Sequence, residues 1–452
     1  MALIRRRSIK RLALYVIAAL ITYQLSRLVF PPDSSLFLVL HWAGVCLHSL
    51  LSPTSNIDTW LLSSAGPHPV DFESRVGILI KTGYGTRERL PAQLDVLSLR
   101  EWDGERAVVV ADFASGGGGG RPVIRDAVGE LMEYLGKWGL GEADRFKKYV
   151  ELRAAIQEGD EEKAQAIGRS VGWELDALKF IWGLGILYKS TPLKDWYLIL
   201  DDDTYLIRQT LTPLLSHLDP STPHYLGNTV GDYRGRFAHG GSAIILSRGA
   251  VAALYRERPE VVHDAHIASL TETWGDKLLA TTLQRIGIFV DERFNHLFNG
   301  ESPVDTRIWG DRFCAPLVGF HELKRPEDMR AVGESLGGWE EPVVWSDVWE
   351  VFGGEDVRGF SARPMREGHD FVGRLKEEAS RTSRGVVSAE RCMRLCMKDG
   401  ERCLAWRWDA GSAECHTAPW MVVGREVDGV VSGVNGESAA ALRARCKRLE
   451  SG

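Results

Sequence analysis

One apolar run that ends in three consecutive carboxylates constrains the fold of this 452-residue chain more than any other feature. Residues 196–200 read Trp-Tyr-Leu-Ile-Leu, which is typical of a buried strand, and Asp201, Asp202 and Asp203 follow directly. Carboxylates this close repel one another unless a cation lies among them. Because carboxylate oxygens suit Mg²⁺ or Mn²⁺, the triplet predicts a metal-assisted site for a phosphorylated donor. A solvated acidic turn after a strand is the alternative.

The chain is long enough for two folded domains with accessory segments. Its apolar content of 44% and charged content of 26% are those of an ordinary globular protein with a sizeable core. The formal net charge of −6 provides no general basic surface, which argues against nucleic acid as a partner. No Asn-x-Ser/Thr sequon occurs in the sequence, so N-glycosylation is not expected.

The N-terminus predicts a membrane anchor. A basic tail, residues 1–11, precedes a mainly apolar segment, residues 12–30, whose length suits one crossing as a signal anchor. The positive charge before this segment predicts a cytosolic tail, with the rest of the chain across the membrane. Because Arg27 interrupts the segment, a buried amphipathic helix is the alternative. Residues 31–73 are assigned as stem and linker; their apolar part, residues 36–51, is membrane-proximal or forms a helical hairpin.

Two earlier apolar runs also end in residues that suit a binding site. Residues 76–81 lead into Thr82 and Gly83, and residues 107–111 lead into Asp112. Both runs read as buried parallel strands, and ligands bind at the carboxyl ends of such strands in open α/β sheets. No GxGxxG follows the first strand, so the fingerprint of dinucleotide binding is absent.

Helices are expected between these strands. Residues 88–99 should form the first helix, and residues 126–190 read as mainly helical. Within that region, residues 149–167 are charged and amphipathic and are expected to form a solvent-facing pair of helices, whereas residues 173–188 are more apolar. The alternation of strands and helices predicts an α/β fold with a mostly parallel sheet.

Two motifs follow the triplet. Gly240 and Gly241 precede a strand expected at residues 244–246, and they permit close approach of the backbone to a ligand. A plain hairpin turn explains the two glycines equally well. Asp276 is expected in the first turn of a helix over residues 274–286, where a carboxylate is favourable at the positive end of the helix dipole even without a function.

A histidine ends the last apolar run of this region. Residues 313–320 are expected to form a strand, and His321 follows them. A histidine in this position is more often a core residue than a ligand. The presence of Asp203 favours a ligand, since imidazole and carboxylate both suit Mn²⁺.

Taken in order, these motifs resemble the Fringe and core 1 β-1,3-galactosyltransferase family of inverting glycosyltransferases (family 31), the fungal branch in particular. The resemblance covers residues 74–325 and implies a Rossmann-like GT-A domain. It implies the transfer of a hexose, galactose in β-1,3 linkage foremost, from a UDP-sugar to a glycan or glycoprotein. It also implies a single-pass type II protein of the Golgi membrane with a lumenal catalytic domain. The motifs read Asp-Asp-Asp-Thr-Tyr, Phe-Ala-His-Gly-Gly-Ser, Trp-Gly-Asp and Phe-His.

The resemblance implies a role for each motif residue. Asp203 and His321 match the metal ligands, with Mn²⁺ the usual ion and Mg²⁺ the alternative, and Asp201 adjoins them as a further ligand. Asp276 matches the catalytic base, although Gly275 stands where many members have an acidic residue. The implied donor-binding residues are Asp201, Asp202, Thr82, Gly83, Asp112, Gly240 and Gly241.

The C-terminal region differs from the rest in its cysteines. Four cysteines fall within 24 residues and a fifth follows, a density that implies disulfides in a chain that faces an oxidising lumen. Residues 384–452 are assigned to a small domain that resembles a PAN/Apple module, a disulfide-rich α+β fold, and residues 326–383 remain unassigned. By that resemblance the implied pairs are Cys392 with Cys415 and Cys396 with Cys403.

Cys446 is left without an obvious partner, and Cys314 is one candidate. PAN/Apple modules bind carbohydrate or protein, which suggests that this one holds the acceptor; a passive, disulfide-stapled lobe is the alternative. Two classes of function therefore remain. The first is an active glycosyltransferase, and the second is a Golgi-anchored binding protein whose transferase fold is catalytically silent.

Overall fold

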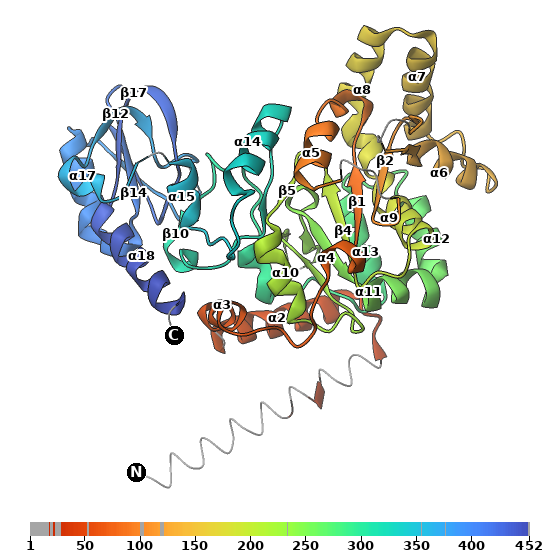
Figure 1. The fold of residues 1–452 in the computed structure, drawn as a ribbon, viewed down its shortest axis with the longest axis horizontal. Helices are drawn as coiled ribbons and strands as arrows, with labels where there is room; N and C mark the ends of the chain where they lie inside the picture. The colour runs from red at the N-terminus through yellow and green to blue at the C-terminus, as the bar shows by residue number, and fades with distance from the viewer. Residues whose placement is uncertain are drawn as a thin grey trace.

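The computed structural model describes residues 18, 21–22, 29–51, 54–99, 104–117, 122–232, 234–353, 355–375 and 377–450. An α/β domain lies beside a smaller C-terminal domain built on an antiparallel sheet (Figure 1). The tail and signal anchor predicted over residues 1–30 lie outside the described residues, apart from a few positions. Within the described part of the chain, no helix combines the length and the apolar character needed to cross a membrane.

In the described residues, a six-stranded sheet in the order β3-β2-β1-β4-β9-β6 forms the centre of the α/β domain. Its strands are β1 (Val76–Lys81), β2 (Ala107–Ala111), β3 (Ile124–Asp126), β4 (Trp196–Asp201), β6 (Tyr225–Gly227) and β9 (Ile244–Ser247). The first four run parallel to one another, and β9 runs antiparallel to both of its neighbours. This arrangement confirms the predicted α/β class with a mostly parallel central sheet.

Side chains of the central strands alternate between two apolar layers, because successive residues of a strand face opposite sides. Ile78 and Ile80 belong to one buried cluster, and Leu79 belongs to another on the opposite face. The first layer contains α5 (Leu90–Val96), α10 (Arg208–Ser216) and α14 (Pro326–Leu336), and the second contains α9 (Lys179–Ser190), α12 (Pro259–Ala268) and α13 (Gly275–Arg285). Burial on both faces explains why these strands are apolar throughout.

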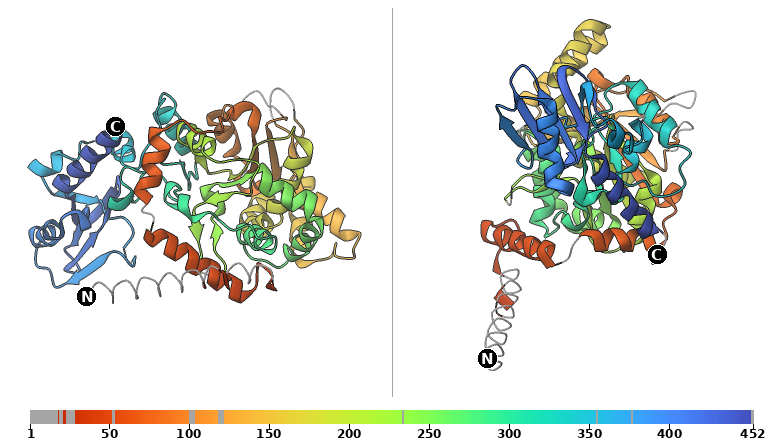
Figure 2. Two further views of the ribbon diagram at one scale, coloured as in Figure 1. Left: turned by 90° about the horizontal axis from the view of Figure 1, so that it is seen from below. Right: turned by 90° about the vertical axis from the view of Figure 1, so that its left-hand side faces the viewer.

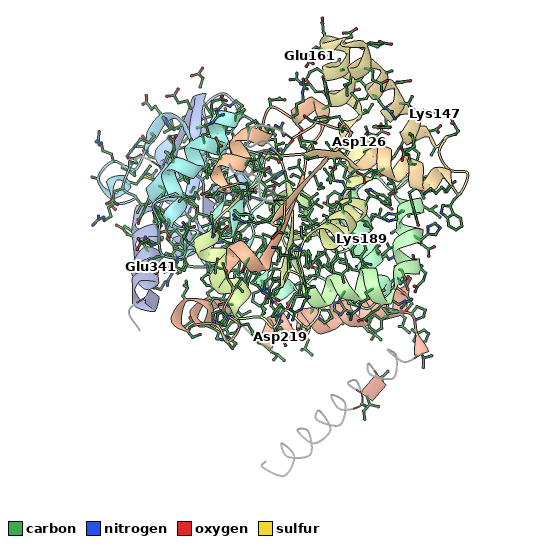
Figure 3. The ribbon with its side chains drawn as sticks, turned by 45° about the vertical axis from the view of Figure 1, so that its right-hand side comes forward. Asp126, Lys147, Glu161, Lys189, Asp219 and Glu341 are labelled. Atoms are coloured by element: carbon green, nitrogen blue, oxygen red, sulfur yellow. A yellow bond between two sulfur atoms is a disulfide. The ribbon has the colours of Figure 1, made fainter. Side chains whose placement is uncertain are left out.

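A helical hairpin projects from the α/β domain. It consists of α7 (Asp144–Glu158) and α8 (Glu161–Asp176), shown in yellow at the top of the right panel of Figure 2. Gly159 ends α7 in the left-handed conformation, with φ of 72°, and Asp160 caps α8 by accepting from the Lys163 amide. Figure 3 shows Glu161 and Lys147 on its two helices. The amphipathic region expected at residues 149–167 is thus divided between two helices.

The predicted stem contains two long helices among the residues that the structure describes. α2 (Ser35–Leu51) is one continuous helix that lies against the α/β domain, where the Phe37 and His41 rings lie over Phe289 at centroid distances of 5.8 and 4.1 Å. α3 (Thr54–Ser63) follows it along the same side of the molecule (Figure 1). Residues 36–51, which were predicted to be membrane-proximal or to form a helical hairpin, therefore lie in one helix that packs on the α/β domain.

The prediction of a strand over residues 313–320 is wrong for most of this segment. Only β11 (Gly319–Phe320) is a strand, and it pairs with β5 (Tyr205–Leu206). Pro316 lacks an N–H, and an isolated bridge to Val344 is the pairing recorded there. The apolar pattern was present because this segment is buried, although it does not form a regular strand.

The C-terminal domain is a five-stranded antiparallel sheet, in the described residues, with the order β12-β17-β14-β15-β13. Its strands are β12 (Arg366–Asp370), β13 (Arg381–Arg384), β14 (Ala405–Asp409), β15 (Glu414–Ala418) and β17 (Arg425–Val434). β12 and most of β13 come from the segment that the sequence left unassigned. The small domain was predicted to begin at residue 384, but its sheet also includes strands that precede this residue.

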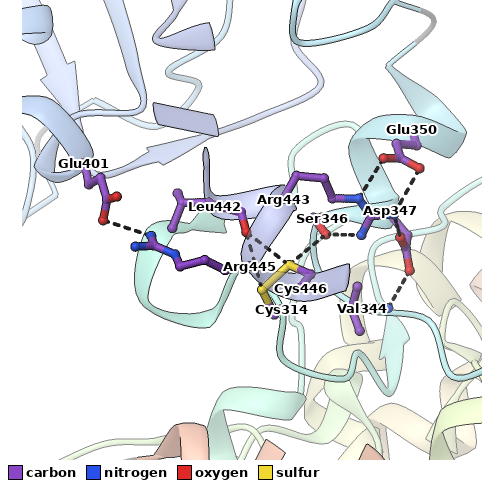
Figure 4. Close-up of a disulfide and its surroundings, with 10 residues drawn as sticks. All are labelled: Cys314, Val344, Ser346, Asp347, Glu350, Glu401, Leu442, Arg443, Arg445 and Cys446. Atoms are coloured by element: carbon purple, nitrogen blue, oxygen red, sulfur yellow. Dashed lines mark hydrogen bonds and ion pairs between the residues drawn. A yellow bond between two sulfur atoms is a disulfide. The ribbon is translucent and has the colours of Figure 1, made fainter. Parts of the chain in front are cut away.

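Three disulfides join the six half-cystines of the described residues. Cys392, on α17 (Ala389–Asp399), is bonded to Cys415, and Cys396 is bonded to Cys403, which are the two pairs that the resemblance implies. The third bond joins Cys314 to Cys446 across a sequence separation of 132 (Figure 4). This bond attaches the last helix of the C-terminal domain to the α/β domain.

Candidate functional site

The candidate site lies where β1, β2 and β4 end. Asp201 is the last residue of β4, while Thr82 and Asp112 directly follow β1 and β2. Because these three strands are parallel neighbours, their carboxyl ends meet at one edge of the sheet. The sequence motifs of three separate segments are therefore brought together by the sheet.

Asp202 is directed into the protein. Its side chain accepts hydrogen bonds from the hydroxyl groups of Thr82 at 2.7 Å and Thr86 at 2.5 Å, and the residue is only 5% exposed. Burial, together with the charge of Asp203, raises the pKa of Asp202 to about 7. Asp202 thus fixes the loop after β1 to the end of β4.

Asp203 and His321 face each other at this edge of the sheet. The Nε2 atom of His321 lies 3.1 Å from Oδ1 of Asp203, and ligand atoms of Asp201, Asp203 and His321 all lie within 4.8 Å of one another. Two adjacent ligands of an octahedral cation, each about 2.1 Å from it, are about 3.0 Å apart, so this separation fits a divalent ion. These three residues could therefore hold a metal.

The Asp203–His321 contact shifts the pKa of both groups. Burial would raise the pKa of Asp203, but the hydrogen bond and positive charge of His321, together with the charges of Arg89 and Lys324, outweigh it, and the net shift is downward. Burial would lower the pKa of His321, but Asp203 outweighs it, and the net shift is upward. The two groups therefore stabilise each other's charged forms.

Two buried lysines that the sequence analysis did not single out neutralise other carboxylates of the site. Lys81 Nζ lies 2.6 Å from Asp201 Oδ1 and 2.8 Å from Asp176, beneath the Phe180 ring. Burial alone would lower the pKa of Lys81, but the two carboxylates raise it above its usual value. A lysine at the end of an otherwise apolar strand is the signal that could have identified it.

The second lysine, Lys179, holds Asp112. Its ammonium donates to the Thr82 carbonyl at 2.7 Å and to Asp112 Oδ2 at 3.1 Å. Asp112 also accepts from the Tyr84 amide at 2.8 Å and is fully buried. Gly83 lies against this pair, since a Cβ there would meet Asp112 Oδ2 at 3.1 Å. These contacts fix the loop between β1 and α5 against the end of β2.

The two glycines connect the two halves of the site. The Gly240 amide donates to Asp276 Oδ2 at 2.9 Å. A Cβ on Gly241 would lie 2.1 Å from His321 Nε2, so the imidazole occupies space that only glycine leaves open. The glycines belong to a short 3₁₀ turn, η2 (Gly240–Ser242), and not to the plain hairpin that was the alternative.

Asp276 lies in the first turn of α13, as predicted. Its carboxylate also accepts from the Lys277 amide at 2.7 Å. Burial raises the pKa of Asp276, although the two amide hydrogen bonds oppose the shift. Trp274, two residues earlier, is 45% exposed, and its ring lies near Phe237 and Lys277.

The fold and site together define a GT-A-type α/β domain joined to a small disulfide-rich domain. Residues 187–286 match the profile of the Fringe family, described as Fringe-like. This part of the chain is therefore a Fringe-like domain, and the family suggests a glycosyltransferase, with a sugar donor and an acceptor in general terms. The matched residues include the aspartate triplet, the glycine pair and Asp276, whereas His321 lies beyond the match.

Proposed function

We propose that this protein is an inverting, metal-dependent glycosyltransferase that moves a hexose from a UDP-sugar to a hydroxyl group of a glycan or glycoprotein. The proposed sugar is galactose in β-1,3 linkage, on the strength of the family resemblance. The observation that carries the proposal is the glycine pair, because Gly240 binds the candidate base Asp276 while Gly241 lies against the candidate metal ligand His321. The candidate base and a candidate metal ligand are therefore both positioned by one pair of adjacent glycines.

Asp203 and His321 would be the principal ligands of a divalent cation, Mn²⁺ or Mg²⁺. A carboxylate and an imidazole suit Mn²⁺, and their 3.1 Å separation fits adjacent positions around the ion. Lys81 already occupies one oxygen of Asp201, so Asp201 would contribute less. When bound, the cation would act as a Lewis acid that stabilises the negative charge of the departing UDP.

Asp276 would remove the proton from the acceptor hydroxyl as that group attacks the anomeric carbon. The amides of Gly240 and Lys277 orient its carboxylate. Its raised pKa makes it a stronger base than an exposed aspartate. Trp274, two residues before it in the sequence, is 45% exposed, and an acceptor sugar would stack on its ring.

The proposal extends to location. We propose a type II Golgi membrane protein with a lumenal catalytic domain, anchored through residues 12–30. The disulfides of the described residues support an oxidising compartment. The C-terminal domain would then face glycan acceptors, which is consistent with a carbohydrate-binding role for a PAN/Apple-like fold.

A screen of UDP-sugars tests the proposal. Purified protein should be stabilised by UDP only when Mn²⁺ is present, and it should hydrolyse or transfer from at least one of UDP-galactose, UDP-N-acetylglucosamine and UDP-glucose. The Asp203→Ala variant should lose the Mn²⁺-dependent part of that thermal shift. Metal-dependent binding without turnover of any of the three donors would instead support a catalytically silent binding protein.

A further inference from the structure

We propose that the C-terminal domain is part of the catalytic unit, because it positions His321 through residues 299–310 of the α/β domain. This inference rests on the proposed function, in which His321 is a metal ligand. It assigns positioning roles to Arg307 and Glu301, whose side chains pair with each other and not with the candidate metal ligands.

The first step is a shared backbone. β10 (Ile308–Trp309) of the α/β domain pairs antiparallel with β16 (Trp420–Met421) of the C-terminal domain. Two loop hydrogen bonds extend this pairing, from the Gly310 amide to the Pro419 carbonyl at 3.1 Å and from the Gly424 amide to the Val304 carbonyl at 3.4 Å. The β16 residues also belong to the same buried apolar cluster as the central sheet. The two domains are therefore continuous at this point.

Arg307 connects this junction to a buried carboxylate. Its Nε donates to Glu301 Oε1 at 2.8 Å, and its backbone amide donates to Glu301 Oε2 at 3.0 Å. Its guanidinium lies over the rings of Trp309 and Trp420, at 5.9 and 5.6 Å from their centroids. One side chain thus contacts both strands of the junction and Glu301.

Further charged groups of the C-terminal segment contact residues 301–307. The Glu301 side chain is only 8% exposed, and Arg374 lies 3.6 Å from it. Glu377 lies 3.6 Å from Arg307, and Arg425 pairs with Asp305. A buried carboxylate is costly unless it is paired, so these contacts hold residues 301–307 firmly in place.

Glu301 and its neighbour hold the histidine. The His321 amide donates to the Glu301 carbonyl at 3.1 Å, and His321 Nδ1 lies 3.4 Å from the Gly300 carbonyl. With Nδ1 protonated toward this carbonyl, Nε2 can exchange the proton that it shares with Asp203 for a metal ion, which gives the form that a metal ligand requires. The backbone of residues 300–301 therefore sets the ring's position and tautomer.

A covalent attachment lies close by in sequence. The Cys314–Cys446 bond fixes α18 (Gly436–Glu450) to the segment that leads to His321 (Figure 4). Beside the bond, Arg443 pairs with Asp347 and with Glu350, each at 2.8 Å. The C-terminal domain is thus held to the α/β domain at both ends of residues 308–314, by the β10–β16 pairing at one end and by the disulfide at the other.

The Arg307→Ala variant tests the inference in the full chain. It should weaken the affinity for Mn²⁺ alone by about tenfold or more, measured by isothermal titration calorimetry, because partners outside the ligand shell tune metal sites by this amount. In metal-free protein it should also speed deuterium exchange of the amides at residues 319–323. Glu301→Gln keeps the shape of the side chain and should shift both measurements in the same direction by less.

Arg384→Ala provides the matched control. Arg384 is an exposed arginine of β13, in the same domain, and it pairs with Glu414 far from the junction, so both measurements should stay at the wild-type values. Unchanged exchange and unchanged Mn²⁺ affinity in both Arg307→Ala and Glu301→Gln would overturn the inference while leaving the proposed function intact. Wild-type protein that binds no Mn²⁺ would overturn the metal centre and, with it, the role given to Arg307.

Discussion

The two sheets of this molecule are stabilised in different ways. The central sheet has apolar layers on both faces, and it keeps charged groups such as Lys81, Asp112 and Asp202 buried at one edge. The C-terminal sheet packs a small cluster around four half-cystines on one face, and its edge strand β13 is exposed throughout. A large core tolerates the cost of buried charge, and the functional groups are placed there, whereas the smaller sheet relies on covalent cross-links.

The largest effect expected is on turnover at the central sheet. Asp276→Asn should lower kcat by roughly 100- to 10,000-fold, because the amide cannot accept the acceptor proton. The thermal midpoint should fall only slightly, since the variant removes a buried charge and keeps its shape, although the asparagine amide group can no longer accept one of the two backbone hydrogen bonds. Steady-state kinetics and thermal unfolding measure the two quantities.

Asp264→Asn is the control for that variant, because Asp264 is an exposed carboxylate on the neighbouring helix α12 and should have no effect on kcat. Normal turnover in Asp276→Asn would remove Asp276 as the base. A large loss of stability would instead show that Asp276 mainly stabilises the fold, as the disulfides do in the C-terminal domain.

The next effect is on the stability of the C-terminal sheet. Replacing Cys392 and Cys415 with serine should destabilise this domain by about 3 kcal/mol, because the bond closes a loop with a sequence separation of 23 in the unfolded chain. Replacing Cys396 and Cys403, with a separation of 7, should cost less. Denaturant unfolding followed by tryptophan fluorescence checks both variants. Equal losses, or none, would contradict the view that cross-links stabilise this sheet and do so more strongly for the longer loop.

A smaller effect follows from packing at the site. Gly241→Ala would place a methyl group where the His321 ring lies, so the affinity for Mn²⁺ should fall by about tenfold to a hundredfold. Gly338→Ala is the control, because a Cβ at Gly338 meets nothing within 4 Å. Calorimetry with Mn²⁺ measures both variants. Wild-type affinity in Gly241→Ala would mean that His321 is not held against this turn when metal binds.

The smallest effect expected is a pH dependence. Asp276 acts as a base only when ionised, and burial raises its pKa above the ordinary aspartate value of 3.8. The value of kcat/KM should therefore be constant above this raised pKa and fall about tenfold per pH unit below it. The residual activity of Asp276→Asn should lack this limb. A limb at or below pH 3.8 would contradict the desolvation of Asp276.

The sequence predicted the central strands well because each is a short apolar run that ends in a polar residue. It also predicted the first turn of α13, where Trp274 and Asp276 mark a helix start. It predicted a solvent-facing pair of helices over residues 149–167, but it did not locate the break between them at Gly159, because the amphipathic pattern continues through this left-handed glycine. The strand over residues 313–320 was overpredicted because an apolar run reports burial and not the pairing of its backbone.

The candidate site was only partly predictable. Its motif residues could be found one segment at a time, but the inward direction of Asp202 and the lysine that pairs with Asp112 depend on contacts between segments far apart in sequence. Arg307 and Glu301 carried no local signal, because their role comes from the strands of another domain. Such contacts leave no spacing pattern in the chain.

The sequence by itself determined the class of fold, the order of the site motifs and the cysteine-rich character of the C-terminal region, because these follow from local hydrophobicity and composition. Only the tertiary structure decided which carboxylates face the site, which lysines neutralise them and how the second domain reaches His321. The physical reason is that charge pairing and close packing depend on distance in space, and parallel strands and an interdomain sheet bring together residues that the chain keeps far apart.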